Sequence, residues 1–100
     1  MTKLVVLYGP PRDTDAFDAH YAETHAPLAE KLPGLRRLEH GRIIAAVDGS
    51  PAPYYYMAEL YFDDPDSLTA GLDSPEGQAT GADAANLAAT GGVTMLVAEA

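Results

Sequence analysis

The sequence has no cysteine among its 100 residues. This absence excludes disulfide bonds, thiolate nucleophiles and cysteine-bound zinc or iron–sulfur clusters. A chain without disulfides is compatible with a reducing compartment, and we expect this protein in the cytoplasm.

Basic residues are also scarce, since 6 lysines and arginines stand against 15 aspartates and glutamates and the formal net charge is −9. Nucleic-acid binding requires basic side chains that neutralise phosphates, and anionic membrane surfaces attract positive patches. We therefore expect neither nucleic acid nor a membrane among the partners. Arg36, Arg37 and Arg42 form the only basic cluster that could bind an anionic substrate.

Long hydrophobic runs and cofactor motifs are missing as well. The apolar stretch that begins at Leu4 stops at Pro10 and Pro11, well short of the roughly 20 residues of a membrane span, and it lacks the flanks of a signal peptide. The sequence has no glycine-rich nucleotide loop and no HExxH spacing. We expect a single domain over residues 1–100, with no metal site and no cofactor.

The segments that are present alternate between two kinds of pattern. Runs rich in β-branched, leucine and aromatic residues predict strands at 3–8, 35–47, 54–62 and 93–98. Capping residues predict one helix from Asp13 or Thr14 and another from Pro65, the second broken at Asp73–Ser74 and continuing over 79–89. The order strand, helix, strand, strand, helix, strand predicts an α+β, ferredoxin-like βαββαβ fold with a four-stranded antiparallel sheet.

The first helix carries an apolar stripe and an interior proline. The stripe has helical spacing and consists of Phe17, Tyr21, Thr24 and Leu28. Pro27 has no amide proton and clashes with the carbonyl four residues earlier, so we expect a kink near His25 and Ala26.

The segment 54–62 has no plainly polar face. Alternation places one set of side chains, Tyr54, Tyr56, Ala58, Leu60 and Phe62, opposite a second set, Tyr55, Met57, Glu59 and Tyr61. In this fold the helices cover only one face of the sheet. We therefore expect a homodimer in which a second copy covers the open sheet face.

One motif, Tyr21-x-x-x-His25-x-Pro27-Leu28, stands out, together with supporting stretches at 3–8, 33–35, 74–77 and 83–87. These stretches resemble the EthD family, small proteins named for a link to ethyl tert-butyl ether degradation, and the motif is the most specific of them. The resemblance implies a dimeric α+β barrel, related to cofactor-free monooxygenases, polyketide cyclases and muconolactone isomerases. It also implies that His25 is a pocket residue, and family members are often called oxidoreductases.

His25 lies four residues after Tyr21, so both side chains can occupy the inner face of the helix. A histidine can accept a proton near neutral pH, and tyrosine hydroxyls can bind the enolate oxygen that results. We predict a pocket between this helix and the sheet with His25 as catalytic residue and a lining of Tyr8, Phe17, Tyr21, Leu28, Tyr54 and Tyr56. The alternative is that His25 caps the carbonyls freed at Pro27.

The other histidines have structural interpretations. His40 and Glu59 lie on predicted strands and could form either a catalytic pair or an interface hydrogen bond that could include Arg42; we prefer the structural role. His20 should point away from the His25 face into solvent.

Three functions remain open. The first is a small cofactor-independent enzyme that acts on an aromatic or polyketide-like molecule by oxygenation, cyclisation or isomerisation. The second is a non-catalytic protein that binds a hydrophobic metabolite. The third is an accessory protein whose main feature is its dimer surface.

Overall fold

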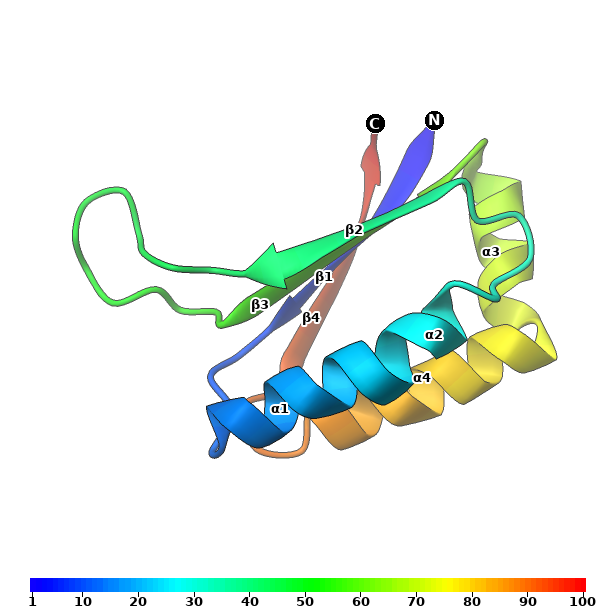
Figure 1. Ribbon diagram of the computed structural model, residues 1–100. Helices are drawn as coiled ribbons and strands as arrows, with labels where there is room; N and C mark the ends of the chain where they lie inside the picture. The colour runs from blue at the N-terminus through cyan, green and yellow to red at the C-terminus, as the bar shows by residue number, and fades with distance from the viewer.

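In the computed structural model, which describes residues 1–100, one antiparallel sheet carries all of its helices on the same face (Figure 1). The strands lie in the order β2-β3-β1-β4, and their bounds are β1 (Thr2–Tyr8), β2 (Arg37–Arg42), β3 (Tyr56–Phe62) and β4 (Val93–Glu99). The chain runs through these elements in the predicted order, so the ferredoxin-like α+β fold is confirmed.

The strand β1 pairs with β3 on one side and with β4 on the other. Its apolar sequence suits this central position, because one full face of the strand is buried. Across β3 its inward residues Leu4, Val6 and Tyr8 stand opposite Leu60, Ala58 and Tyr56. All six are buried beneath the helices. This register sets which tyrosines can meet the helical layer.

The first helical segment has three parts: α1 (Thr14–His20), a π-helical turn η1 (Tyr21–His25) and α2 (Ala26–Ala29). Asp13 caps α1 by accepting a hydrogen bond from the amide of Ala16. The amide of Ala26 donates to the carbonyl of Tyr21, five residues back. The irregularity expected near His25 is therefore a π-turn, just before Pro27, which has no amide to continue the α-helical ladder.

The π-turn changes which residues face the sheet. An extra residue in this turn rotates everything that follows, so the buried positions after Tyr21 are His25, Ala26 and Ala29. The predicted stripe is wrong beyond Tyr21, because Thr24 is exposed and Leu28 is only half-buried.

The second helical region is broken at the predicted place, into α3 (Pro65–Asp73) and α4 (Pro75–Leu87), but α4 begins directly at Pro75 and ends at Leu87 rather than spanning 79–89. Ser74 organises the break: its hydroxyl accepts from the amide of Gly77 and donates to the carbonyl of Gly71. A Cβ atom at Gly77 would lie 2.2 Å from the Leu72 carbonyl oxygen, so the close approach of the two helices requires glycine there.

The strands β2 and β3 are shorter than predicted. Residues 43–55 form an irregular connection that projects beyond the sheet (Figure 1) and exposes Ile44 and Val47. Tyr54 lies in this connection rather than in β3. A turn closed by a hydrogen bond from the amide of Gly49 to the carbonyl of Ala46 lies in this connection, and the apolar residues on either side of it do not extend the regular ladder.

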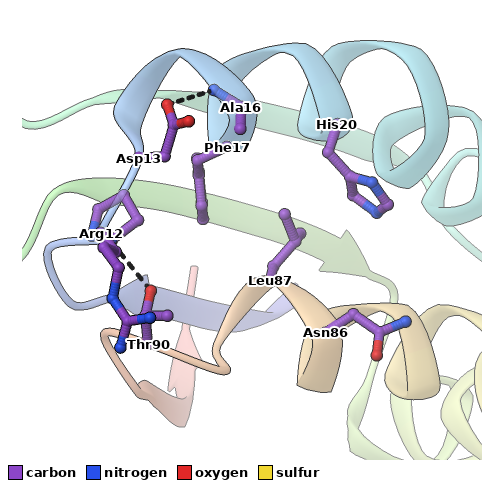
Figure 2. A pocket seen from close by; sticks show the side chains of 9 residues that line it. Arg12, Asp13, Ala16, Phe17, His20, Asn86, Leu87 and Thr90 are labelled. Carbon is purple, nitrogen blue, oxygen red and sulfur yellow. Dashed lines mark hydrogen bonds between the residues drawn. The ribbon is translucent and has the colours of Figure 1, made fainter.

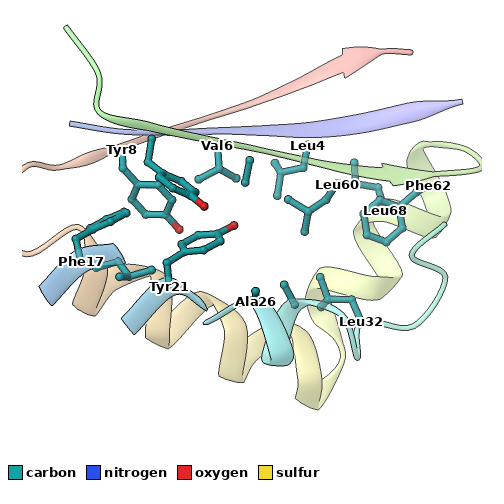
Figure 3. Close-up of a cluster of buried hydrophobic side chains, with 14 residues drawn as sticks. Leu4, Val6, Tyr8, Phe17, Tyr21, Ala26, Leu32, Leu60, Phe62 and Leu68 are labelled. Atoms are coloured by element: carbon teal, nitrogen blue, oxygen red, sulfur yellow. The ribbon is translucent and has the colours of Figure 1, made fainter. Parts of the chain in front are cut away.

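The core fills the space between sheet and helices, with Phe62 fully buried at one end (Figure 3). The other face of the sheet carries no helix. Its side chains include Val5 and Leu7 from β1, Met57 from β3 and Leu96 from β4, the last two exposed. No helix combines the length and the apolar character needed to cross a membrane.

Candidate functional site

Aromatic side chains from both layers meet under the left half of the sheet in Figure 3. Tyr8 and Tyr56 come from neighbouring strands, and Phe17 and Tyr21 come from the first helical segment. The rings of Tyr21 and Tyr56 have centroids 4.4 Å apart, and those of Tyr8 and Phe17 lie 5.3 Å apart in an edge-to-face arrangement. Four of the predicted pocket residues are thus in one aromatic cluster.

His25 adjoins this cluster and is almost completely buried. Its ring centroid lies 5.0 Å from that of Tyr21, and its Nδ1 atom lies 2.8 Å from Oδ2 of Asp83 on α4. Burial lowers the pKa of His25 below its ordinary value, and the hydrogen bond to Asp83 partly opposes this shift. The carboxylate also selects one tautomer, because Nδ1 must carry the proton that Asp83 accepts.

Asp83 binds a second histidine. The Nε2 atom of His20 lies 2.7 Å from Oδ1 of Asp83. Burial favours the neutral form of Asp83, but the hydrogen bonds from His20 and His25 outweigh it and hold the pKa of this carboxyl below its usual range. The prediction that His20 is simply solvated is therefore wrong, although its side chain is 39% exposed.

An interior cavity of about 80 Å³ lies between the layers beside His25. Its walls come from the sheet, from the first helical segment and from α4, and include Tyr8, Tyr21, Thr80, Gly81 and Met95. In Figure 3 the Tyr8 ring descends from the sheet and the Tyr21 ring rises from the helices, so that their hydroxyls approach the same space.

Three polar atoms at this cavity have no partner in the chain: the hydroxyls of Tyr8 and Tyr21, and Nε2 of His25. No fully buried side-chain nitrogen or oxygen lacks a hydrogen bond, so these three atoms must each reach open space. Burial raises the pKa of both Tyr8 and Tyr21, so both phenols remain protonated donors at neutral pH. The cavity thus combines one available base with two available donors.

The size of the cavity limits what it can hold as it stands. An apolar cavity that binds benzene has about 150 Å³, roughly twice this volume. A few waters or a small molecule fit directly. Met95 lies at the cavity and is 47% exposed, and its unbranched side chain can move aside more easily than a branched one.

The remaining predicted lining residues lie elsewhere. Leu28 does not reach the cavity because the π-turn rotates it away, and Tyr54 does not because it precedes β3. Tyr56 lies behind Tyr21, and its hydroxyl bonds Nδ1 of His40 at 2.6 Å. Phe17 lines an outer groove instead.

His40 and Glu59, considered as a catalytic pair or as partners in an interface hydrogen bond, do not pair with each other. His40 stands opposite Ala58 and therefore lies on the helix side of the sheet, whereas Glu59 lies on the open side and binds Nζ of Lys3 at 2.7 Å. The sequence did not reveal the β2–β3 register, and the two side chains point to opposite faces in the register that forms.

Sequence reasoning missed Asp83. Asp83 lies between Ala82 and Ala84 in an alanine-rich helix, where an aspartate has a lower helix propensity than the alanines around it. That isolation is the signal that could have marked it. Its partners lie 58 and 63 residues away in the chain, so only the packed structure identifies them.

A larger groove of about 390 Å³ opens on the outside between α1 and the end of α4 (Figure 2). Its lining includes Arg12, Phe17, His20, Leu87 and Thr90, and the amide of Arg12 donates to Oγ1 of Thr90. Asp83 separates this groove from the interior cavity, since it bonds His20 on one side and His25 on the other. No group of three histidine or acidic side chains is arranged to hold a metal ion.

Comparison with known proteins gives concordant matches. The model of the EthD domain family matches residues 9–91. An uncharacterised 11.0 kDa protein of the thcB–thcC intergenic region of Rhodococcus erythropolis is 41% identical over 96 residues, which cover 96% of this chain and 91% of that protein. The crystal structure of an EthD family protein from Bacillus halodurans C-125 is 42% identical, with a TM-score of 0.92 over 100% of this chain and 98% of that one.

More distant structures share the fold. SnoaB from Streptomyces nogalater, a cofactor-independent oxygenase, is 19% identical with a TM-score of 0.70 over 99% of this chain and 91% of that one. Other structures at this distance are described as dimeric ferredoxin-like proteins.

Proposed function

The chain belongs to the EthD family, and from this premise we propose that it is a small enzyme that removes a proton from an enolisable or phenolic small molecule in the interior cavity. The observation that carries the proposal is the set of three unpartnered polar atoms at that cavity. His25 offers a lone pair, and Tyr8 and Tyr21 offer hydroxyl protons.

The chemistry follows from these roles. Nε2 of His25 accepts a proton from the carbon next to the substrate carbonyl, or from a phenol, and the ring becomes an imidazolium. Asp83 stabilises this cation through Nδ1, 2.8 Å from its carboxylate. The negative charge moves to the substrate oxygen, where the hydroxyls of Tyr8 and Tyr21 donate hydrogen bonds.

The resulting enolate is the common entry to isomerisation, cyclisation and reaction with oxygen. Return of the proton from His25 to another carbon completes an isomerisation. Attack of the enolate on a second carbonyl of the same molecule closes a ring, and the alkoxide that forms takes the proton back from His25. The fold shared with a cofactor-independent oxygenase supports the third route, in which the enolate carbon transfers two electrons to O₂ and bonds to it, and the resulting peroxide anion takes the proton from His25 to give a hydroperoxide.

The cavity volume favours substrates with a small reactive end. A lactone, a short ketone or a single phenolic ring suits about 80 Å³ better than a fused polycyclic molecule, provided that Met95 moves to admit the ring. This narrows the aromatic or polyketide-like class expected from the sequence toward single-ring members.

We also propose that the protein acts as a homodimer through the open sheet face. Val5, Leu7, Met57 and Leu96 form an apolar area there, with the Lys3–Glu59 ion pair beside it. Dimeric proteins of the same fold support this arrangement. The second copy would keep apolar surface from water while leaving the interior cavity to each chain.

Deuterium exchange measures the proposed step without requiring a known product. Lactones and enolisable ketones are incubated with the protein in D₂O, and NMR follows loss of the exchangeable carbon-bound proton. We expect catalysed exchange for one class, lowered about 10²–10⁴-fold in His25→Gln, because the general base is lost. Tyr8→Phe should lose about 10²–10³-fold, the usual effect of one oxyanion donor.

His40→Gln is the matched control, since it also removes an imidazole but one that does not line the cavity. Exchange that is equal in the wild type and His25→Gln would contradict the proposal. Binding of a ligand with no exchange for any class would favour a non-catalytic binding protein, and neither binding nor exchange would favour an accessory dimer.

A further inference from the structure

We infer that His20 is a positioning residue for His25: by sharing the Asp83 carboxylate, it lets proton uptake in the outer groove set the basicity of the interior histidine. The catalytic meaning of this inference rests on the proposed function, but the coupling itself does not. It requires a bridging carboxylate, two separate routes to solvent and a reason for both rings to reach one acid.

The bridging carboxylate is explicit in the geometry. Each oxygen of Asp83 bonds a different imidazole, Oδ1 to Nε2 of His20 at 2.7 Å and Oδ2 to Nδ1 of His25 at 2.8 Å. An ionised carboxylate only accepts hydrogen bonds, so both rings must present an N–H to it. The nitrogen that does not bond Asp83 is therefore Nδ1 on His20 and Nε2 on His25.

These two nitrogens belong to different environments. The His20 side chain is 39% exposed and lines the outer groove, where Figure 2 shows its ring in the space between the two helices. The His25 side chain is 7% exposed and lines the interior cavity. His20 thus exchanges protons with water in the groove, and His25 with whatever occupies the cavity.

The π-turn explains how both rings reach one acid. Positions five residues apart on a regular α-helix, with 3.6 residues per turn, point about 140° away from each other. In η1 the hydrogen bonds span five residues, so the turn holds more residues and residue i+5 lies closer to the face of residue i than it does in an α-helix. His20 precedes this turn and His25 ends it, so the turn brings both to the side where α4 presents Asp83.

Sharing the acid couples the two titrations. When His20 takes up a proton, its positive charge offsets the charge of Asp83, and a second imidazolium at His25 becomes less favourable. When His20 is neutral, Asp83 supports a cation at His25 alone. Acid in the groove therefore weakens the interior base, in line with the lowering effect of His20 on the pKa of His25.

The other groups around His25 do not provide the same control. Tyr8 from β1 and Tyr21 from η1 adjoin its ring, and burial raises their pKa so that both stay neutral. His40 from β2 acts only at a distance, since it bonds Tyr56. The charged side chains that line the outer groove together with His20 are Arg12 and Asp13.

The test is an NMR titration of the imidazole rings in the intact protein, labelled with ¹³C and ¹⁵N at histidine and free of ligand. In the wild type we expect the His25 signals to show two steps, one of them coinciding with the titration of His20. In His20→Gln we expect a single step for His25, moved to higher pH because the competing positive charge is gone. Glu23→Gln is the control for a charge change on the same helical turn, since Glu23 is exposed and makes no bond to Asp83.

The inference is overturned if the wild-type His25 signals show no step at the pH where the His20 signals change, and if the His25 titration is unchanged in His20→Gln. The wild-type curve decides the matter alone if the variant does not fold. Because no substrate is present, this result is independent of the exchange assay. If exchange is catalysed, its acid limb should also move to higher pH in His20→Gln.

Discussion

The two faces of the same sheet differ in what they bury. Toward the helices, β3 presents Tyr56, Ala58, Leu60 and Phe62, and this side includes buried polar groups held by long-range hydrogen bonds. Toward the other side, the same strand presents Met57, Glu59 and Tyr61, where an apolar area lies beside ion pairs.

The helix side of the sheet suits the proposed chemistry, and the open side suits the proposed association of two copies. The helix side is shielded from bulk water, so hydrogen bonds and charges act more strongly there, as catalysis requires. The open side has apolar surface with charged groups beside it, which is the composition of a protein interface. Because successive side chains of β3 point to opposite faces of the sheet, this one strand contributes to both sides. The predictions below test the difference between the two faces.

The largest expected effect is in the helix-side core. Phe62→Ala should lower the free energy of unfolding by about 3–5 kcal/mol, because a fully buried ring leaves a cavity. Urea denaturation at fixed protein concentration measures the loss. Met57→Ala, a truncation on the open face of the same strand, should cost less, and equal losses would argue that the two faces are packed alike.

The next effect should appear on the open face. Leu96→Lys should raise the dimer dissociation constant by about a hundredfold or more, because a two-fold interface places the added charge twice in apolar surroundings. Sedimentation velocity over a concentration series measures this change. Val47→Lys makes a similar change in the exposed 43–55 connection and should leave the dimer intact; an unaltered dimer in Leu96→Lys would place the interface elsewhere.

The smallest effect concerns pH. Burial lowers the pKa of His25 in the folded protein, against the opposing hydrogen bond from Asp83, so the unfolded chain binds more protons once the pH falls below about 6.5. Stability should therefore decline on acidification below that pH, and the decline should be shallower in His25→Gln. Melting temperatures between about pH 7 and pH 5 provide the measurement.

The lowered pKa of Asp83 adds a second, more acidic contribution. Its stabilising effect is present above the ordinary carboxyl pKa of about 3.9 and is lost as the pH falls below it. A wild-type profile that stays flat from neutral pH down to this range would show that the interior imidazole is not perturbed by burial.

Much of the fold was predictable, and the reason is local. Val and Leu in β1, the Asp13 cap and the Ser74 break each act within a few residues, and each occurs where the sequence predicted it. The ends of β2 and β3 were overestimated, because the regular pairing ends at Arg42 and Tyr56 and is followed only by a hydrogen bond from the amide of Ile43 to the carbonyl of Tyr55.

The site was less predictable. The sequence singled out His25, Tyr8 and Tyr21, which the structure brings to one cavity, but it also included Leu28, Tyr54, Tyr56 and Phe17, which do not line it. The first two errors trace to one extra residue in a helical turn and to a strand that starts two residues late. The His40–Glu59 pairing failed because register depends on the partner strand.

The sequence by itself determined the order of elements, the starts of the helical regions near Asp13 and Pro65, the break at Ser74 and the presence of a histidine on the inner helical segment, since patterning, caps and proline act locally. Only the tertiary structure decided that His25 has Asp83 as its partner, that His20 shares the same acid, and that two tyrosine hydroxyls remain free beside them. Those contacts join residues about sixty positions apart, and close packing of α4 against the π-turn alone brings them within hydrogen-bonding distance.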